Sequence, residues 1–295
     1  MPSRSVDNGF WRSPHGRALP CDFNRRTLLM GIVNATPDSF SDGGNFSDPE
    51  AARYHAIRLV SDGADIIDLG AESTRPGAVR IDAEEECRRL LPALRAIREA
   101  LPEIPVSVDT SRPEVAEAAI LSGADVINDV LAIGAADEVS VCSGYPMGTL
   151  AARLGAPLIA MHNRQSADYT DFRNDFFKDI SVGIERILRS GIAENQLWLD
   201  PGFGFGKTPE QNLQLVACFR SIAEFGFPVL LGTSRKSTLG IVLGGKPPLE
   251  RVGGDSACCV LGAFHGAACL RLHDIAAHRD AVTVADALFH AAPGF

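Results

Sequence analysis

Short apolar runs recur along the chain, and nearly every one ends in a polar or charged residue. A buried strand has no structural need for such an ending, because a polar group taken out of water costs free energy unless it is bonded. The runs, each with the residues that follow it, are 28–33 then Asn34, 66–69 then Gly70 and Glu72, 106–108 then Asp109, 126–127 then Asn128, 158–161 then His162 and Asn163, 197–199 then Asp200, 229–231 then Ser234, Arg235 and Lys236, and 269–272, interrupted by Arg271, then His273. The pattern predicts eight strands whose ends carry chemistry.

The segments between these runs have the periodicity of surface helices. Between residues 87 and 101, apolar residues repeat at intervals of three and four, with charges on the other face. The same pattern predicts helices over 49–62, 113–122, 172–190, 209–224, 250–267 and 279–291. The polar strand ends mostly lie 34 to 39 residues apart, which is the length of one strand, one helix and two loops.

Eight such units predict an α/β fold of the (β/α)8 type, a TIM barrel. Short apolar runs flanked by helices indicate a parallel sheet buried on both faces, and eight units close into a barrel. An open doubly wound sheet is the alternative, but no GxGxxG follows the first strand. We expect a flexible N-terminal arm over 1–27 and a single barrel domain over 28–295. The active site of such a barrel lies at the carboxyl ends of the strands.

Composition narrows the class of protein. The net charge of −9 argues against nucleic-acid binding, so an anionic ligand must meet a local cluster of Arg and Lys. No run of 18 apolar residues exists to span a membrane, and residues 1–27 lack the apolar core of a secretory signal. The seven cysteines show no CxxC spacing, so we expect reduced thiols and a cytoplasmic protein.

The loops after the first two strands have the composition of substrate-handling loops. Residues 34–44 form a long polar stretch that would be costly to order without a ligand, which predicts a mobile lid. An ordinary Gly/Pro/Asp connection would explain this composition, but not a polar Asn34 at the strand tip followed by a lone apolar Phe40. In the second loop, Arg75 precedes Pro76, and a guanidinium on a proline-stiffened loop can reach an anion.

Three inner strand ends carry Asp109, Asn128 and Asp200. Their acceptors and amide donors suit a flat, nitrogen-rich heterocycle. One buried Asp is usually a structural hydrogen-bond partner, but three polar residues at equivalent positions are harder to explain in that way.

The last two units place Arg235, Lys236 and His273 together, beside a helix start near Ser237. We expect a phosphate or carboxylate site there, with surface salt bridges as the alternative. The turn at 200–208 has Pro201 where a P-loop needs glycine, so we reject a nucleoside triphosphatase and expect its glycines to bring Phe205 beside the substrate.

With these motifs in order, the chain is similar to the dihydropteroate synthases of the folate pathway, the targets of sulfonamide drugs. The resemblance runs from about residue 28 to 274 through the motifs at 30–44, 72–77, 107–110, 127–129, 161–163, 200–208, 233–237 and 271–274. It implies condensation of 6-hydroxymethyl-7,8-dihydropterin diphosphate with 4-aminobenzoate, giving 7,8-dihydropteroate and diphosphate. It also implies Mg²⁺ as the cofactor, a homodimer, and sulfonamides as inhibitors.

The resemblance also implies a role for each matching residue. Pterin binding falls to Asp109, Asn128, Met161, Asp200 and Lys236. Diphosphate binding falls to Asn34, Arg75, Arg271 and His273, with Asn34 also on the metal. The aminobenzoate site comprises Thr36, Pro37, Phe40, Thr74, Pro76, Phe205 and Ser237. The residues expected to act in catalysis are Asp38, Arg75, Asp109 and Lys236.

If diphosphate leaves before the amine attacks, in an SN1-like reaction, catalysis needs anion stabilisation and water exclusion rather than a strong base. The first two loops would then close over the site.

Two other functions compete with this one. A methyltetrahydrofolate-corrinoid methyltransferase needs none of the anion-handling motifs, and a non-catalytic pterin-binding paralogue would have lost some of them. The chain departs from the family pattern at Ala35 and Ala71, and in a longer segment between Asn128 and His162.

Overall fold

The eight predicted strands form a closed parallel barrel in the computed structural model, which describes residues 13–17, 26–35, 49–72, 80–134 and 145–291. The strands are β1 (Leu28–Asn34), β2 (Ile66–Gly70), β3 (Val106–Asp109), β4 (Val126–Ile133), β5 (Leu158–His162), β6 (Leu197–Asp200), β7 (Leu230–Leu231) and β8 (Cys269–Leu272). Their order in the sheet is β6-β5-β4-β3-β2-β1-β8-β7. A bridge between Leu199 and Val229 joins the two ends of this sheet, so the (β/α)8 barrel is confirmed.

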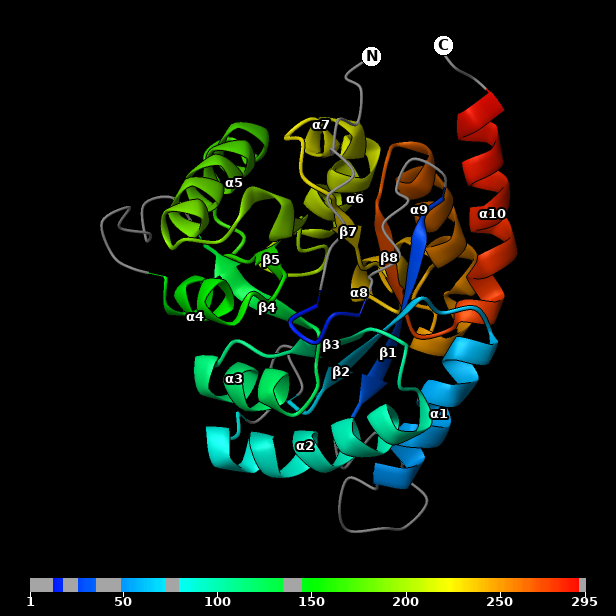
Figure 1. Cartoon of the computed structure of the whole chain (residues 1–295). Coiled ribbons are helices and arrows are strands. Elements are labelled where there is room, and N and C mark those ends of the chain that lie inside the picture. Colours follow the sequence, from blue (N-terminus) through cyan, green and yellow to red (C-terminus); the bar gives the residue numbers. More distant parts are fainter. Residues whose placement is uncertain (1–12, 18–25, 36–48, 73–79, 135–144, 292–295) are drawn as a thin grey trace.

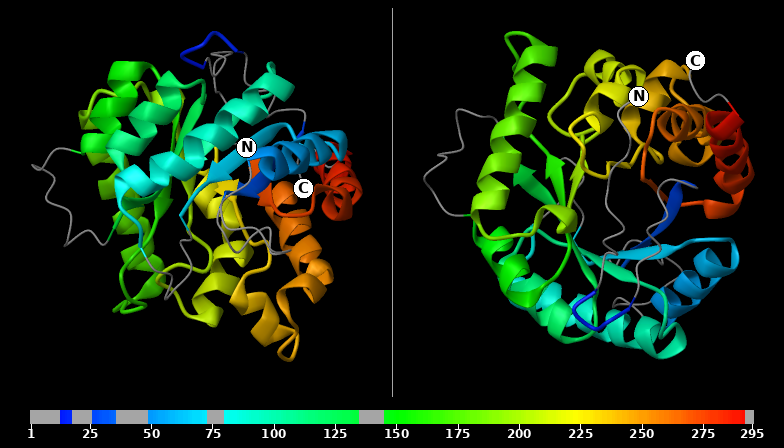
Figure 2. Two further views of the ribbon diagram at one scale, coloured as in Figure 1. Left: turned by 90° about the horizontal axis from the view of Figure 1, so that it is seen from below. Right: turned by 45° about the horizontal axis from the view of Figure 1, so that its top comes forward.

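A ring of helices surrounds the strands (Figures 1 and 2). These helices are α1 (Pro49–Ser61), α2 (Ala83–Ala100), α3 (Pro113–Leu121), α4 (Pro146–Leu154), α5 (Phe172–Arg189), α6 (Pro209–Ala217), α7 (Phe219–Ala223), α8 (Ser237–Val242), α9 (Val252–Phe264) and α10 (Ile275–Ala291). Local sequence explains where several of them begin. Asp82 caps α2 by accepting a bond from the Glu85 amide, and Thr208 and Gln211 form a capping box at α6. Proline opens α3, α4 and α6, where its missing N–H costs nothing.

The structure corrects three details of the predicted elements. The helix expected over 209–224 is divided at Cys218 into α6 and α7. Helix α4 was not predicted. Strand β4 continues through Asn128 to Ile133 with a register shift after Asp129, so Asn128 lies inside the strand rather than at its end. The longer segment after Asn128 therefore holds the rest of β4 and all of α4, and its residues 135–144 lie outside the described part.

Strand alternation sends one set of side chains into the barrel and the other against the helices. The inner set forms an apolar cluster of Leu28, Met30, Ile66, Val126, Ile159, Trp198, Leu230, Ala268 and Cys269. A larger cluster, between the strands and the helices, forms the main core. The inner cluster fills the amino-terminal part of the barrel, so the next inward positions toward the carboxyl ends form the floor of any site.

The described part of the predicted N-terminal arm contacts the barrel. The Arg17 side chain donates to the Asp125 carboxylate at 2.8 Å and to the Gly123 carbonyl at 2.8 Å. Asp125 is buried and also accepts from Arg98, at 2.8 Å. These contacts lie just before β4, at the amino-terminal side of the barrel, away from the strand ends that carry the polar residues.

Candidate active site

The candidate site stands directly on the inner apolar cluster. On five strands, the residue two positions after a member of that cluster is polar, charged or a methionine. These residues are Asp68, Asn128, Met161, Asp200 and Arg271, and Asp109 ends the neighbouring strand β3. Since residues i and i+2 of a strand share a face, all of them point into the barrel. The fold thus converts separate sequence motifs into one polar layer.

Arg271 is the centre of an ion-pair network in this layer. Its Nε donates to the Asp68 carboxylate at 2.6 Å, and its Nη2 donates to Asp109 at 2.7 Å. The Asn128 amide nitrogen lies 3.4 Å from the same Asp68 carboxylate. One guanidinium therefore orders two carboxylates and, through Asp68, an amide.

Asp68 is a site residue that the sequence reading missed. It is fully buried in the middle of β2, whereas the sequence reading considered only the residues that end the apolar runs. The sequence does contain a signal for Asp68, namely a carboxylate in the middle of the apolar run Ile66–Gly70. A buried carboxylate needs a charged or hydrogen-bonding partner, which indicates a polar site inside the barrel.

Two acceptors in this layer are ready for a ligand. Within the part of the chain that the structure describes, Asp109 Oδ1 and Asn128 Oδ1 are buried and have no hydrogen-bond partner. Buried oxygens are rarely left unpaired, because each loses its bonds to water. A ligand with N–H donors would satisfy both oxygens.

Burial also controls the charge of these acceptors. It raises the pKa of Asp109 to about 7, and the neighbouring Asp68 acts in the same direction, while Arg271 and Lys236 oppose the shift. Burial likewise raises the pKa of Asp200, against the bond from the Gly202 amide and the charge of Lys236. Asp109 therefore changes its charge near neutral pH, and a ligand that donates to it favours the ionised form.

The turn after β6 brings an aromatic ring to the site. Asp200 Oδ1 accepts from the Gly202 amide at 2.7 Å, which fixes the start of the turn. Further along the turn, the Phe205 ring lies under the Lys236 ammonium, with Nζ 3.8 Å from the ring centroid. This contact brings Phe205 to Lys236, another predicted site residue, and its place beside the substrate stays a prediction. Met161 is buried beside Asp200 in the register of β5 and β6.

The expected anion site is divided between two places. Lys236 faces Phe205, whereas Arg235 and His273 line a separate polar cavity of about 180 Å³ with Arg58 and Asp274. Arg235 has a φ of 61°, the one positive value for a non-glycine residue in the described ranges. Its carbonyl accepts from Arg251 at 2.7 Å, which helps to hold this strained conformation.

The predicted binding residues at the rim take different positions. His273 is bonded to Ser234, with its Nδ1 3.1 Å from Oγ. Ser237 is exposed at the start of α8, and Asn34 ends β1 in a partly buried position. The remaining predicted residues lie outside the described part of the chain: Thr36, Pro37, Asp38, Phe40, Thr74, Arg75 and Pro76.

The donor set decides how a metal could be held. Among the residues with described positions, no three His, Cys, Asp or Glu side chains are grouped to bind a metal ion. Asn34 supplies a single hard oxygen at the end of β1. Mg²⁺ is commonly held by one or two protein oxygens together with substrate phosphates and water. The described residues therefore form no protein cage for a metal ion, and an oxygen such as that of Asn34 would suit a divalent ion held mainly by water and ligand oxygens.

A barrel whose inner layer offers buried acceptors and nearby cations defines a class of enzyme that binds nitrogen-rich heterocycles. Residues 30–273 match the family model described as pterin binding enzyme. A dihydropteroate synthase from Clostridium beijerinckii is 41% identical, over 90% of this chain and 96% of that protein. The chain belongs to the pterin-binding enzymes and, within them, to the dihydropteroate synthases.

Solved structures agree with this assignment. The dihydropteroate synthase of Xanthomonas albilineans with 4-aminobenzoic acid has a TM-score of 0.85 and 41% identity, covering 95% of this chain and 98% of that one. The Yersinia pestis enzyme in a sulfonamide drug complex has a TM-score of 0.82 and 38% identity, covering 94% of this chain and 98% of that one. Both share the fold over nearly their whole length.

Proposed function

We propose that this chain condenses 6-hydroxymethyl-7,8-dihydropterin diphosphate with 4-aminobenzoate, giving 7,8-dihydropteroate and diphosphate. The observation that carries the proposal is the pair of buried, unpaired acceptors Asp109 Oδ1 and Asn128 Oδ1 among the described residues, next to Arg271. A relative solved with 7,8-dihydropteroate is 39% identical to this chain with a TM-score of 0.80, which supports the same product here.

The pterin binds in the inner polar layer. Asp109, Asn128 and Asp200 receive or donate hydrogen bonds along the heterocycle edge, and Met161 packs against its face. Lys236 sits between this layer and Phe205, so its charge balances the carboxylates while its stem borders the turn.

The diphosphate binds at the cationic rim. Asn34, Arg75, Arg271 and His273 hold it, and Mg²⁺ held by Asn34 and the phosphate oxygens would neutralise the charge of the leaving group. Arg271 would then both bind diphosphate and hold the carboxylates of Asp68 and Asp109. Because the metal is needed for the leaving group and not for the pterin, chelation of divalent metal should abolish turnover while leaving pterin binding measurable.

The aminobenzoate binds between the turn and the first two loops. Phe205 and Ser237 contribute from the described part, and Thr36, Pro37, Phe40, Thr74 and Pro76 contribute from the loops. The loops close once diphosphate is bound, and Asp38 completes the closed site. Sulfonamides, which share the aromatic amine, compete for this place.

The reaction breaks the bond between the pterin methylene carbon and the diphosphate oxygen, and the electron pair leaves with diphosphate. The methylene cation that remains is stabilised by the pterin ring, and the aminobenzoate nitrogen attacks it and then loses a proton. The chain's residues act by binding the leaving anion and excluding water rather than by a strong base.

The test mixes purified protein, magnesium, the pterin diphosphate and aminobenzoate, and measures diphosphate and dihydropteroate. We expect the two products in equal amounts, with diphosphate release dependent on aminobenzoate. Pterin binding without any aminobenzoate-dependent product would instead identify a non-catalytic paralogue. Methyl transfer from methyltetrahydrofolate to a corrinoid protein would identify the methyltransferase.

We also propose that the chain works as a cytoplasmic homodimer. The described cysteines 87, 218, 258, 259 and 269 are free thiols, which suits a reducing compartment. Leu261 of α9 and Val284 and Leu288 of α10 are exposed apolar residues on adjacent helices, a surface that a second copy could cover. No helix in the described ranges is long and apolar enough to cross a membrane. Sedimentation of the purified protein tests the dimer.

A further inference from the structure

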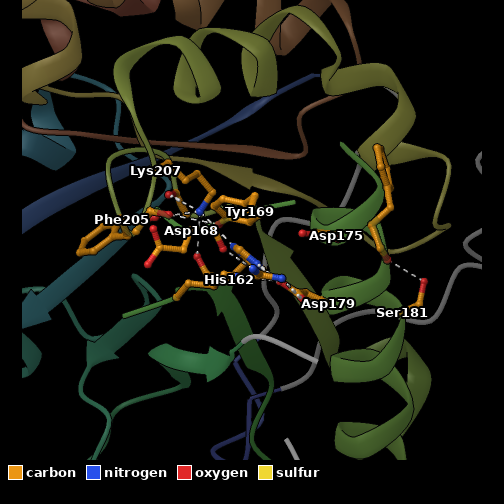
Figure 3. Close-up of polar contacts among 12 residues, drawn as sticks. His162, Asp168, Tyr169, Asp175, Asp179, Ser181, Phe205 and Lys207 are labelled. Atoms are coloured by element: carbon orange, nitrogen blue, oxygen red, sulfur yellow. Dashed lines mark hydrogen bonds and ion pairs between the residues drawn. The ribbon is translucent and has the colours of Figure 1, made fainter. Parts of the chain in front are cut away.

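The side-chain nitrogen of Lys207 lies in a cage of acceptors behind the active site. Nζ is 2.9 Å from the Phe205 carbonyl oxygen, 3.0 Å from that of Gly202 and 3.3 Å from that of His162. It is also 3.0 Å from Nδ1 of the His162 ring. Figure 3 shows Lys207 between the turn and the His162 ring. Burial lowers the pKa of Lys207 to about 7, while Asp200 and Asp179 favour the charged form, and in that form the ammonium group has three donors for these acceptors.

The cage is anchored to α5 through a chain of polar contacts. Nε2 of His162 lies 3.0 Å from the Asp179 carboxylate, which also accepts from Nε of Arg164 at 2.7 Å. Burial and the nearby Lys207 lower the pKa of His162 to about 4, so the ring is neutral at pH 7. A neutral ring that donates from Nε2 to Asp179 leaves Nδ1 as the acceptor for Lys207.

The turn between Asp200 and Lys207 is pressed between two neighbours. A Cβ at Gly202 would lie 1.8 Å from the His162 carbonyl oxygen, and a Cβ at Gly206 would lie 2.2 Å from that of Arg164. On the other side, a Cβ at Gly204 would lie 3.0 Å from Cδ of Lys236. The backbone therefore runs in direct contact with the end of β5 on one side and with a pterin-site lysine on the other.

Lys207 connects these features to the site. Lys207 bonds the carbonyl oxygens of Gly202 and Phe205. The Gly202 amide donates to the Asp200 carboxylate, and the Phe205 ring contacts the Lys236 ammonium. Three carbonyl oxygens converging on one point require a common donor, because oxygen dipoles repel one another when nothing lies between them.

We propose that Lys207 is a positioning residue for the condensation. By bonding Gly202 and Phe205 from behind, it sets the distance between the Asp200 carboxylate and the Phe205 ring, and so aligns the pterin with the aminobenzoate. The hydrogen bonds of Lys207 are to the turn and to His162, so its effect on the reaction passes through these groups. The inference rests on the proposed function, and it adds a residue with no role in the binding sites described above.

The test compares Lys207→Met with Tyr169→Phe. Methionine keeps the length and volume of the stem but removes every donor. Tyr169 donates its hydroxyl to the Gly206 carbonyl at 3.1 Å, so its replacement removes one bond from the same turn and leaves the cage intact. If Lys207→Met does not fold, Lys207→Gln keeps two N–H donors on a shorter stem and serves as the second variant.

Two measurements are made on each variant. Steady-state kinetics give kcat and KM for both substrates, and amide hydrogen exchange reports the Gly202, Gly204 and Phe205 amides, which are all bonded in this turn. For Lys207→Met we expect the KM for aminobenzoate to rise at least tenfold and exchange at the three amides to quicken at least tenfold. Tyr169→Phe should stay within about twofold in both.

The outcomes are distinguishable. If the wild type is active and the Lys207 variant has unchanged kinetics or unchanged exchange, the positioning role is overturned. Equal falls in kcat/KM for Lys207→Met and Tyr169→Phe would also overturn it, because any loosening of the turn would then explain the loss of activity. If the wild type itself gives no aminobenzoate-dependent product, the proposed function fails, and a positioning role in that reaction fails with it. The exchange data then show separately whether Lys207 holds the turn.

Discussion

Asp68 and Arg271 lie 203 positions apart in the sequence and are joined in the barrel interior by a hydrogen bond of 2.6 Å from the guanidinium Nε to the carboxylate. Arg271 also bonds Asp109, so Asp68 determines where the guanidinium points and which oxygen of Asp109 stays available. Removing one partner of a buried ion pair typically costs about 3–5 kcal/mol, because the other charge is left uncompensated. The pair therefore links the stability of the barrel to the arrangement of the pterin site.

Replacement of Asp68 by Asn should impair pterin binding, because Asp68 is fully buried within the polar layer and bonds Arg271. The amide keeps an acceptor for Arg271 but loses the charge, so the guanidinium turns toward Asp109. We expect kcat/KM for the pterin diphosphate to fall at least tenfold, which is about 1.4 kcal/mol of transition-state stabilisation. The matched control is Glu117→Gln, which removes a carboxylate from an exposed ion pair with Arg153 and should change nothing. An unaltered KM and kcat in Asp68→Asn would show that Asp68 serves the fold alone.

Pterin affinity should depend on pH through Asp109. Its pKa in the folded chain is raised by burial to about 7, above its ordinary value of 3.8. The folded state therefore binds more protons than the unfolded state between these values, so this group makes stability fall as pH rises from about 4 to about 7. Ligand binding has the opposite dependence, because only the ionised carboxylate is a pure acceptor for pterin N–H groups.

We expect the dissociation constant for the pterin to decrease as pH rises through about 7 and to level off above it. Calorimetric titration at several pH values measures this directly, and binding near pH 7 should release protons to the buffer. Asp109→Asn cannot titrate, so its affinity should be lower and flat over the same interval. A wild-type affinity that does not change between roughly pH 6 and 8 would contradict the role of Asp109.

Sequence pattern predicted the barrel because each strand is a compact apolar run with a clear end. Helix α4 was missed because glycines precede it and because Pro146, its first residue, suggests a loop. The one-residue break at Cys218, which is the C-cap of α6 and the N-cap of α7, is likewise a local effect. Periodicity identifies elements that are long and uniform, and these two are neither.

The candidate site was predicted in part. The convergence of Asp109, Asn128 and Asp200 could be predicted because the inward positions toward the carboxyl ends of barrel strands face one space, although Asn128 lies inside β4 and not at its end. The bond from Arg271 to Asp68 could not be found, since no spacing rule relates residues on β2 and β8 of a closed barrel. The separation of Lys236 from Arg235 was also missed, because it depends on the left-handed backbone at Arg235, which sends adjacent side chains in different directions.

Substitution of Gly202 by Ala should destabilise the protein far more than the same change at Gly226. Both glycines have positive φ, 69° and 85°, so the backbone strain on a new Cβ is comparable, at about 1 kcal/mol. At Gly226 nothing lies within 4 Å, whereas at Gly202 the new Cβ would meet the His162 carbonyl oxygen at 1.8 Å. The turn must then move away from β5, which adds about 1–3 kcal/mol. Denaturant unfolding of both variants measures the difference, and equal losses would mean that the turn is free to shift.

Asp38→Ala tests the predicted lid. Asp38 lies in the loop after β1, outside the described residues, and is proposed to act only in the closed state. Because the pterin is held by the inner polar layer, the variant should keep the affinity for pterin within about threefold. We expect kcat to fall at least tenfold. These two results together would show that Asp38 stabilises the transition state and not the bound substrate. Asp42→Ala removes the same charge from the same loop and is expected to have a smaller effect on kcat. Pterin affinity is measured by calorimetry and kcat by diphosphate release at saturating aminobenzoate. If Asp38→Ala weakens pterin binding as much as it slows turnover, the loop belongs to the resting pterin site and does not close over it later.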